Sequence, residues 1–227
     1  QLMNFAVLWD LDGTISDSFQ CFYMALERIL SEQKPTIKIT PEEYKSQYFG
    51  ATFPSILDRM YQGKLSDTQI WELNERYFKY SVEFARQGTV FPIPGVESFL
   101  KKLHAADIRM AIASSSTVEM IFTELDVLGF ISYFDNIISG NLLPSKPAPD
   151  VFQIAAASIR AQPSQCVVIE DSVAGITAAK NAGMRTIAVT TTNPADKFGP
   201  ADRVTEDFRK FDIDALKSLF VTDFSNL

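Results

Sequence analysis

The sequence is poor in histidine and cysteine, the residues that most often hold zinc or form nucleophile–base pairs. It contains one histidine, His104, and two cysteines, Cys21 and Cys166. The cysteines are far apart and form no CxxC pair, which excludes a disulfide framework and a thiolate zinc site. A single histidine excludes a histidine-rich metal site, and a helical apolar pattern around His104 predicts a surface position rather than a catalytic triad.

Positive charge and long apolar runs are also scarce. Lys and Arg number 21 against 28 Asp and Glu, a formal net charge of −7, which argues against a nucleic acid or an anionic membrane as partner. No apolar run approaches the length of a membrane span. Residues 1–4 lack the basic flank and cleavage site of a signal peptide. With unpaired cysteines, these features favour a cytoplasmic protein, and we expect a monomer.

The remaining composition is that of a globular chain with a sizeable core. Hydrophobic residues make up 46% and charged residues 22% of the 227 positions. This length suits one large domain or a core that carries an insert. Even an acidic chain can bind a phosphate, because a metal ion or a buried lysine reverses the local field.

Short apolar runs alternate with helical patterns along much of the chain. The runs are continuous, which is typical of strands buried on both faces of a parallel sheet. They span residues 5–9, 108–113, 136–138, 166–169 and 186–189. The helical patterns span residues 96–104, 118–125, 149–159 and 173–182. The alternation predicts an α/β fold with a doubly wound, mainly parallel, Rossmann-like sheet.

One region, residues 16–88, interrupts this alternation with helical patterns alone. Thr40 and Ser66 each begin a capping box, in which Glu43 and Gln69 stand three residues later. A proline-rich stretch at residues 91–95 marks the return to the alternating pattern. We therefore predict a core formed by residues 1–15 and 89–227, and an inserted α-helical cap domain of residues 16–88 over the strand ends.

Two pairs of acidic residues follow predicted strands. Asp10 and Asp12 come after the first strand, and Glu170 and Asp171 come after the strand 166–169. Ligands of open α/β sheets bind beyond the carboxyl ends of strands, so we expect the two pairs to meet. Each pair alone is also compatible with a turn or a helix cap. Together they form an oxygen-rich site of the kind that suits Mg²⁺.

Polar residues at two further strand or helix boundaries complete the predicted site. Ser114 and Ser115 end the strand 108–113, where a hydroxyl would donate to a phosphate oxygen. Lys146 precedes Pro147 in a loop before a helix, and proline restricts such a loop. A plain loop serine and a solvated lysine are the alternatives. A cluster of four acids needs a fixed positive charge, which favours the functional role for Lys146.

These residues occur in the order of four known motifs. The motifs are Asp10-x-Asp12-Gly13-Thr14, Ser114, Lys146 within Lys146-Pro147-Ala148-Pro149-Asp150, and Glu170-Asp171-Ser172-x-x-Gly175. In them the chain resembles haloacid dehalogenase-like hydrolases, in the branch that contains β-phosphoglucomutase and phosphoglycolate phosphatase. The resemblance covers essentially the whole chain, including the cap after the first motif. Four motifs in order are far more specific than one.

The resemblance implies a role for each residue. Asp10 would be the nucleophile that forms an aspartyl-phosphate. Asp12 would protonate the leaving oxygen and then activate water. Ser114 and Lys146 would hold phosphoryl oxygens, and Lys146 would also restrain Asp10.

The metal site implied by the resemblance holds Mg²⁺. Its ligands would be the carboxylates of Asp10, Glu170 and Asp171 and the main-chain carbonyl oxygen of Asp12. Dehalogenases and phosphonate-cleaving relatives lack the second carboxylate of the first motif, so Asp12 argues against both activities.

The expected function is a Mg²⁺-dependent phosphatase that hydrolyses a small phosphorylated metabolite. A phosphomutase of the β-phosphoglucomutase type is the nearest alternative, and a non-catalytic phosphate-sensing or partner-binding protein is a third. We expect substrate contacts at Ser115 and Gly50, and interpret Phe49 and Phe53 as cap packing. Residues 50–57 contain no Arg or Lys to hold a second phosphate, which favours hydrolysis, although Arg59 and Lys45 lie nearby in sequence.

Overall fold

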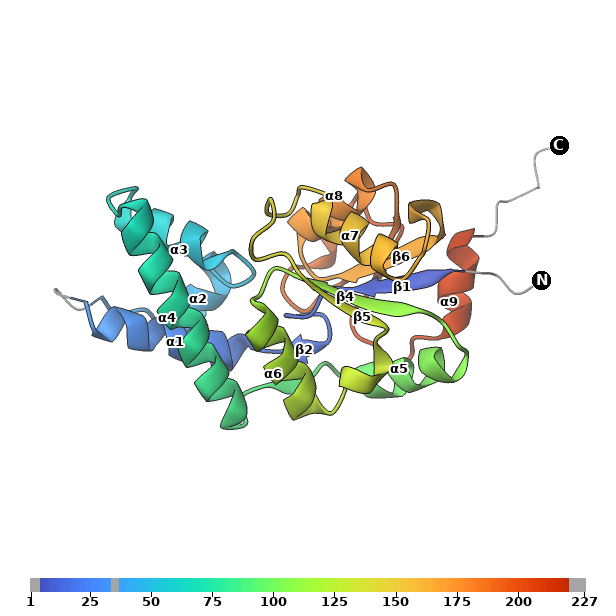
Figure 1. Ribbon diagram of the computed structural model, residues 1–227, viewed down its shortest axis with the longest axis horizontal. Helices are drawn as coiled ribbons and strands as arrows, with labels where there is room; N and C mark the ends of the chain where they lie inside the picture. The colour runs from blue at the N-terminus through green and yellow to red at the C-terminus, as the bar shows by residue number, and fades with distance from the viewer. Residues whose placement is uncertain (1–4, 34–36, 221–227) are drawn as a thin grey trace.

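The computed structural model describes residues 5–33 and 37–220, so the prediction about residues 1–4 lies outside it (Figure 1). Its core is a six-stranded sheet with the order β5-β4-β1-β6-β7-β8, in which all neighbouring pairs are parallel. The strands are β1 (Ala6–Trp9), β4 (Met110–Ser114), β5 (Asn136–Ser139), β6 (Cys166–Glu170), β7 (Arg185–Val189) and β8 (Arg203–Thr205). The predicted parallel α/β fold is confirmed.

Helices cover both faces of this sheet. They are α5 (Val96–Ala105), α6 (Val118–Leu128), α7 (Asp150–Ser158), α8 (Val173–Asn181) and α9 (Ile213–Lys217). Alternate side chains of a strand point to opposite faces, and β1 shows this directly. Val7 and Trp9 pack in one apolar cluster with α5, α6 and α9, while Ala6 and Leu8 pack in another with α7 and α8. Figure 1 shows these helices on the two sides of the sheet.

Short 3₁₀ helices complete the connections of the core. They span Ile131–Tyr133, Pro163–Gln165, Ala195–Phe198 and Ser218–Phe220. No helix in the part of the chain that the structure describes is both long and apolar enough to cross a membrane. His104 is exposed on α5, and Cys21 and Cys166 are buried free thiols.

The inserted cap consists of four helices on one side of the molecule (Figure 1). They are α1 (Phe19–Ser31), α2 (Pro41–Gln47), α3 (Phe53–Tyr61) and α4 (Asp67–Arg86). Both predicted capping boxes are present, at Thr40 and at Ser66. The cap has its own apolar cluster, in which the Phe53 and Tyr77 rings stack at 3.9 Å. Met120 of α6 belongs to the same cluster, so the cap packs against the core.

The two chain crossings between core and cap lie side by side. They form β2 (Ser16–Asp17) and β3 (Phe91–Pro92), which pair antiparallel in a separate two-stranded sheet. The sequence predicted no strand after residue 16, because two residues cannot show an alternating pattern. β8 was missed for the same reason, since it has only three residues.

Candidate active site

The two acidic pairs meet because β1 and β6 are neighbouring parallel strands. Trp9 pairs with Ile169, so Asp10 and the Glu170–Asp171 pair leave the sheet at the same edge. One carboxylate oxygen from each of Asp10, Glu170 and Asp171 lies within 4.8 Å of the others. All three side chains are buried. The predicted convergence of these acids at the strand ends is therefore present in the structure.

Lys146 provides the positive charge of this cluster. Its Nζ donates to Asp10 Oδ1 at 2.6 Å, to Glu170 Oε1 at 2.8 Å and to the Ala113 carbonyl oxygen at 3.2 Å. Its side chain is only 9% exposed. Burial disfavours the charged amine, but the two carboxylates outweigh burial and raise the pKa of Lys146 above its ordinary value. The ammonium is therefore held among the acids rather than in solvent.

The buried acids carry more negative charge than Lys146 neutralises. Burial raises the pKa of Asp10 to about 7, against the opposing effect of Lys146. Burial, followed by the charges of Glu170 and Asp10, also raises the pKa of Asp171 well above its usual range. A divalent cation among these oxygens would remove that repulsion. Carboxylates without sulfur or imidazole ligands fit a hard ion, so Asp10, Glu170 and Asp171 suit a metal of this kind.

Asp12 turns away from the cluster. Its Oδ1 accepts from Ser18 Oγ at 2.7 Å, and its Oδ2 accepts from Ser116 Oγ at 2.9 Å and from Ser114 Oγ at 3.5 Å. The Asp12 carboxyl thus lies apart from the three acids that would hold a metal, and only its main chain is predicted to be a ligand. Ser114 is fully buried, whereas Ser115 is half-buried in the turn that follows β4.

Gly13 allows the acidic turn to approach the second acidic pair. Its φ is +80°, a conformation that side chains with a Cβ rarely adopt. A Cβ at this position would lie 2.1 Å from Asp171 Oδ2 and 2.9 Å from Thr192 Oγ1. Glycine therefore permits both the turn and the packing of β1's loop against the loop after β6.

Thr192 is a site residue that the sequence did not indicate. Its hydroxyl donates to Asp171 Oδ2, and it lies in the loop after β7. The only sequence feature that could have indicated Thr192 is its position shortly after a strand, because no acidic residue lies beside it. Gly50 of the cap approaches the same threonine, because a Cβ at Gly50 would lie 3.2 Å from Thr192 Cγ2. The loop between α2 and α3 thus reaches the acidic cluster.

Glu124 is a second residue that was missed. Its side chain is fully buried on α6, one oxygen accepts from Ser16 Oγ, and Oε1 has no partner within the described residues. Burial, and then the nearby Asp12 carboxylate, raise the pKa of Glu124 well above its usual range. Glu124 follows Met120 and Ile121 by four and three residues, which places it on the apolar face of the helix. This spacing could have indicated from the sequence that Glu124 is buried.

The raised pKa of the buried Glu124 carboxyl predicts a pH dependence of stability. When the pKa of an acid is higher in the folded than in the unfolded protein, the protein becomes less stable as the pH rises above the unfolded-state pKa. For Glu124 the unfolded-state pKa is 4.5. We therefore expect Glu124→Gln to gain up to about 1.4 kcal/mol of unfolding free energy per pH unit over the unsubstituted protein. Urea unfolding in chelator between pH 5 and pH 8 measures this difference.

The control for this prediction is Glu119→Gln, a change to an exposed glutamate of the same helix. Its unfolding free energy should differ from that of the unsubstituted protein by no more than about 1 kcal/mol, because its ion pair with Arg86 is exposed. If the unfolding free energy of Glu124→Gln also changed with pH in parallel with that of the unsubstituted protein, Glu124 would ionise at its ordinary pKa.

The comparisons with known proteins agree with this fold and this arrangement of acids. The family model of haloacid dehalogenase-like hydrolases matches residues 7–189. The chain belongs to the haloacid dehalogenase-like hydrolase family, and the resemblance found in the sequence is confirmed.

The relatives of this chain within the family include proteins named as phosphatases and one named as a phosphomutase. The chain is 31% identical over 194 residues to a probable pseudouridine-5'-phosphatase of Drosophila melanogaster, covering 80% of each chain. It is also 31% identical over 191 residues to the β-phosphoglucomutase of Bacillus subtilis, covering 81% of this chain and 82% of the relative. The crystal structure of a β-phosphoglucomutase from Clostridium difficile aligns with a TM-score of 0.80 at 25% identity, over 95% of this chain and 96% of that one.

Proposed function

We propose that this protein is a Mg²⁺-dependent phosphatase that hydrolyses a small phosphorylated metabolite through an aspartyl-phosphate. The observation that carries the proposal is the contact of Lys146 with both Asp10 and Glu170. It holds a positive charge beside the acid predicted to attack phosphorus, at the strand ends where the other acids meet. The names of the relatives, which include phosphatases and a phosphomutase, support phosphoryl transfer as the reaction class.

Each residue of the site has a chemical task in this reaction. Asp10 attacks phosphorus and forms an acyl-phosphate bond, while the bond to the leaving oxygen breaks. Asp12 gives its proton to that oxygen, and afterwards takes a proton from the water that cleaves the aspartyl-phosphate. Lys146 and Ser114 bind phosphoryl oxygens. Asp10, Glu170, Asp171 and the Asp12 carbonyl oxygen would hold the metal ion, which would neutralise negative charge when bound.

The separation of Asp12 from the other acids supports this division of labour. Asp12 is hydrogen-bonded to Ser18 and Ser116, which belong to the entry to the cap and to the turn after β4. A carboxyl in that position would remain available to a leaving group, because it is not among the acids that would hold the metal. We further propose residues 1–15 and 89–227 as the core domain, residues 16–88 as the cap domain, and the cytoplasm as the compartment.

The metal requirement is tested by hydrolysis of p-nitrophenyl phosphate. We expect activity in Mg²⁺ and a fall of at least about 100-fold in chelator, because several kcal/mol of charge stabilisation depend on the ion. Ca²⁺ should inhibit, since its larger and looser shell misplaces the phosphoryl group. Restoration by Mg²⁺ is the control for unfolding. Undiminished hydrolysis in chelator would contradict the assignment.

The mutase alternative requires a cation for a second phosphate, usually an arginine. The two candidates from the sequence are engaged elsewhere or exposed. Arg59 donates to the Gln47 carbonyl oxygen and stacks on the Tyr48 ring at 4.7 Å, and Lys45 is exposed on α2. With β-glucose 1-phosphate and a bisphosphate primer, we expect release of free phosphate. Efficient formation of glucose 6-phosphate would favour the mutase.

A further inference from the structure

The hydroxyl of Thr192 holds one oxygen of a buried acid. Thr192 lies in the loop that follows β7, and its hydroxyl donates to Asp171 Oδ2. Among the residues that the structure describes, no other side chain donates to this oxygen, and the Oδ1 atom receives a long contact of 3.5 Å from Thr14. Asp171 is buried, so water cannot readily replace the hydroxyl. The orientation of the Asp171 carboxylate therefore depends on Thr192.

The residues on either side of Thr192 fix its loop to both acidic turns. The Thr191 hydroxyl donates to the Gly13 carbonyl oxygen, in the turn after β1. The Asn193 side-chain amide donates to the Asp171 carbonyl oxygen at 3.2 Å. A Cβ at Gly13 would lie 2.9 Å from Thr192 Oγ1, so the threonine packs directly against the first acidic turn. Thr192 is thus held in the position where its hydroxyl meets Asp171.

The methyl group of Thr192 contacts the cap. A Cβ at Gly50 would lie 3.2 Å from Thr192 Cγ2, so the cap main chain approaches this methyl group closely. Gly50 lies between α2 and α3 with a φ of +83°, in a turn where the Ala51 amide donates to the Tyr48 carbonyl oxygen at 3.0 Å. Glycine at this position therefore allows both the turn and the contact with the core.

Threonine combines the two groups that these contacts use. Its β-carbon carries a hydroxyl and a methyl group, whereas serine lacks the methyl group and valine lacks the hydroxyl. A β-branched side chain has few preferred χ1 rotamers, so the hydrogen bond to Asp171 also fixes the direction of the methyl group. One side chain thus connects an acid of the core with a loop of the cap.

We propose that Thr192 is a positioning residue, whose hydroxyl orients Asp171 for the metal ion and whose methyl group supports the cap loop at Gly50. Asp171 is a ligand of Mg²⁺ in the proposed function, on which this inference rests. Acids that bind metal ions are commonly held by hydrogen bonds from neighbouring groups, and loss of such a group weakens metal binding. The loop after β7 lies outside all four sequence motifs.

Titration with Mg²⁺ alone tests the role of the hydroxyl. Thr192→Val keeps the volume of the side chain and removes the donor, so we expect the dissociation constant for Mg²⁺ to rise about 10- to 100-fold. Thr192→Ser keeps the donor and is the matched control, which should bind Mg²⁺ nearly as tightly as the unsubstituted protein. Calorimetry measures the constant, and for weak binding the rise of the unfolding temperature with Mg²⁺ concentration gives it.

Circular dichroism establishes that each variant is folded. If Thr192→Val does not fold, Thr192→Ala removes the same hydroxyl with no added bulk and should weaken Mg²⁺ binding in the same direction.

Hydrogen exchange of the cap loop tests the role of the methyl group. The Ala51 amide is hydrogen-bonded within the loop, so its exchange rate reports how often the loop opens. In saturating Mg²⁺, Thr192→Ser should raise this rate by up to about 4-fold, the effect of one lost methyl contact. Thr192→Val keeps a methyl group and should leave the rate unchanged, so each variant is the control for the other.

The outcomes separate failure of this inference from failure of the proposed function. Equal Mg²⁺ affinity in folded Thr192→Val and Thr192→Ser would overturn the role of the hydroxyl. Equal Ala51 exchange in Thr192→Ser and the unsubstituted protein would overturn the role of the methyl group. Absence of Mg²⁺ binding to the unsubstituted protein would overturn the metal assignment itself. The expected pattern of Mg²⁺ binding without hydrolysis of p-nitrophenyl phosphate would support Thr192 as a positioning residue and overturn the phosphatase.

Discussion

Asp10→Asn should abolish turnover and leave no phosphoenzyme. An amide cannot attack phosphorus as a carboxylate does, so we expect kcat to fall at least about 10⁴-fold. The variant should still fold, because the Asn oxygen can accept the Lys146 hydrogen bond, which is 2.6 Å long in the structure. Acid quenching after incubation with a radiolabelled phosphate ester, followed by counting of protein-bound label, measures the intermediate.

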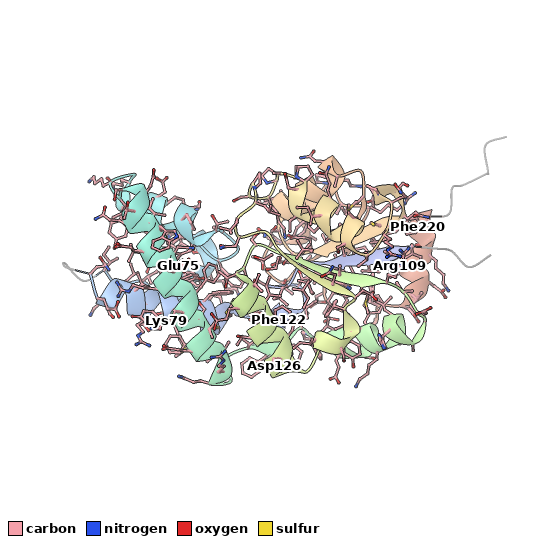
Figure 2. The ribbon with its side chains drawn as sticks, in the orientation of Figure 1. Glu75, Lys79, Arg109, Phe122, Asp126 and Phe220 are labelled. Atoms are coloured by element: carbon pink, nitrogen blue, oxygen red, sulfur yellow. The ribbon has the colours of Figure 1, made fainter. Side chains whose placement is uncertain are left out.

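The matched control is Asp126→Asn, which makes the same chemical change on the exposed face of α6 (Figure 2). It should retain full turnover and normal labelling. Labelling of the Asp10 variant at the level of this control would show that another residue carries the phosphoryl group.

Asp12→Asn should retain the nucleophile but lose the group that moves the proton. General acid–base catalysis is typically worth about 10²- to 10⁴-fold, so phosphoenzyme formation from an alkyl phosphate should slow by that factor. Nitrophenolate leaves with little need for a proton, so the same step should slow much less for p-nitrophenyl phosphate. Rapid-quench measurements of both esters give the two rates.

The second half of the reaction provides an internal check of the Asp12 role. Breakdown of the aspartyl-phosphate needs an activated water, and the leaving alcohol has already gone. The Asp12→Asn variant should therefore break down its phosphoenzyme equally slowly whichever ester formed it. Equal slowing of formation for alkyl and nitrophenyl esters would contradict the proposed proton transfer.

The convergence of the acids was predictable because it depends on topology. Parallel strands bring their carboxyl ends to one edge, and acids directly after two apolar runs must lie near that edge. Lys146 followed from the charge that such a cluster requires. Family membership followed from the order of the motifs, and the comparison with the family model confirms it.

The direction of individual side chains was not predictable in the same way. Asp10 and Asp12 are two residues apart, yet one joins the cluster and the other contacts Ser18 and Ser116. Glu124 and Thr192 belong to the site through tertiary contacts with Ser16 and Asp171, and neither residue lies in a recognisable sequence motif. A pattern in sequence identifies which elements meet, whereas these contacts depend on how the turns and helices pack.

The adjacent chain crossings at β2 and β3 bear on how such a protein can change over time. Both ends of the inserted helices are anchored at one ribbon, where Ser16 pairs with Pro92 and Asp17 with Phe91. A segment whose ends the host already holds together can vary in length and content at little entropic cost. The inserted cap can therefore be exchanged or lengthened while the core sheet stays unaltered. Any replacement of the cap helices must still cover Met120, the core residue that packs in the cap cluster.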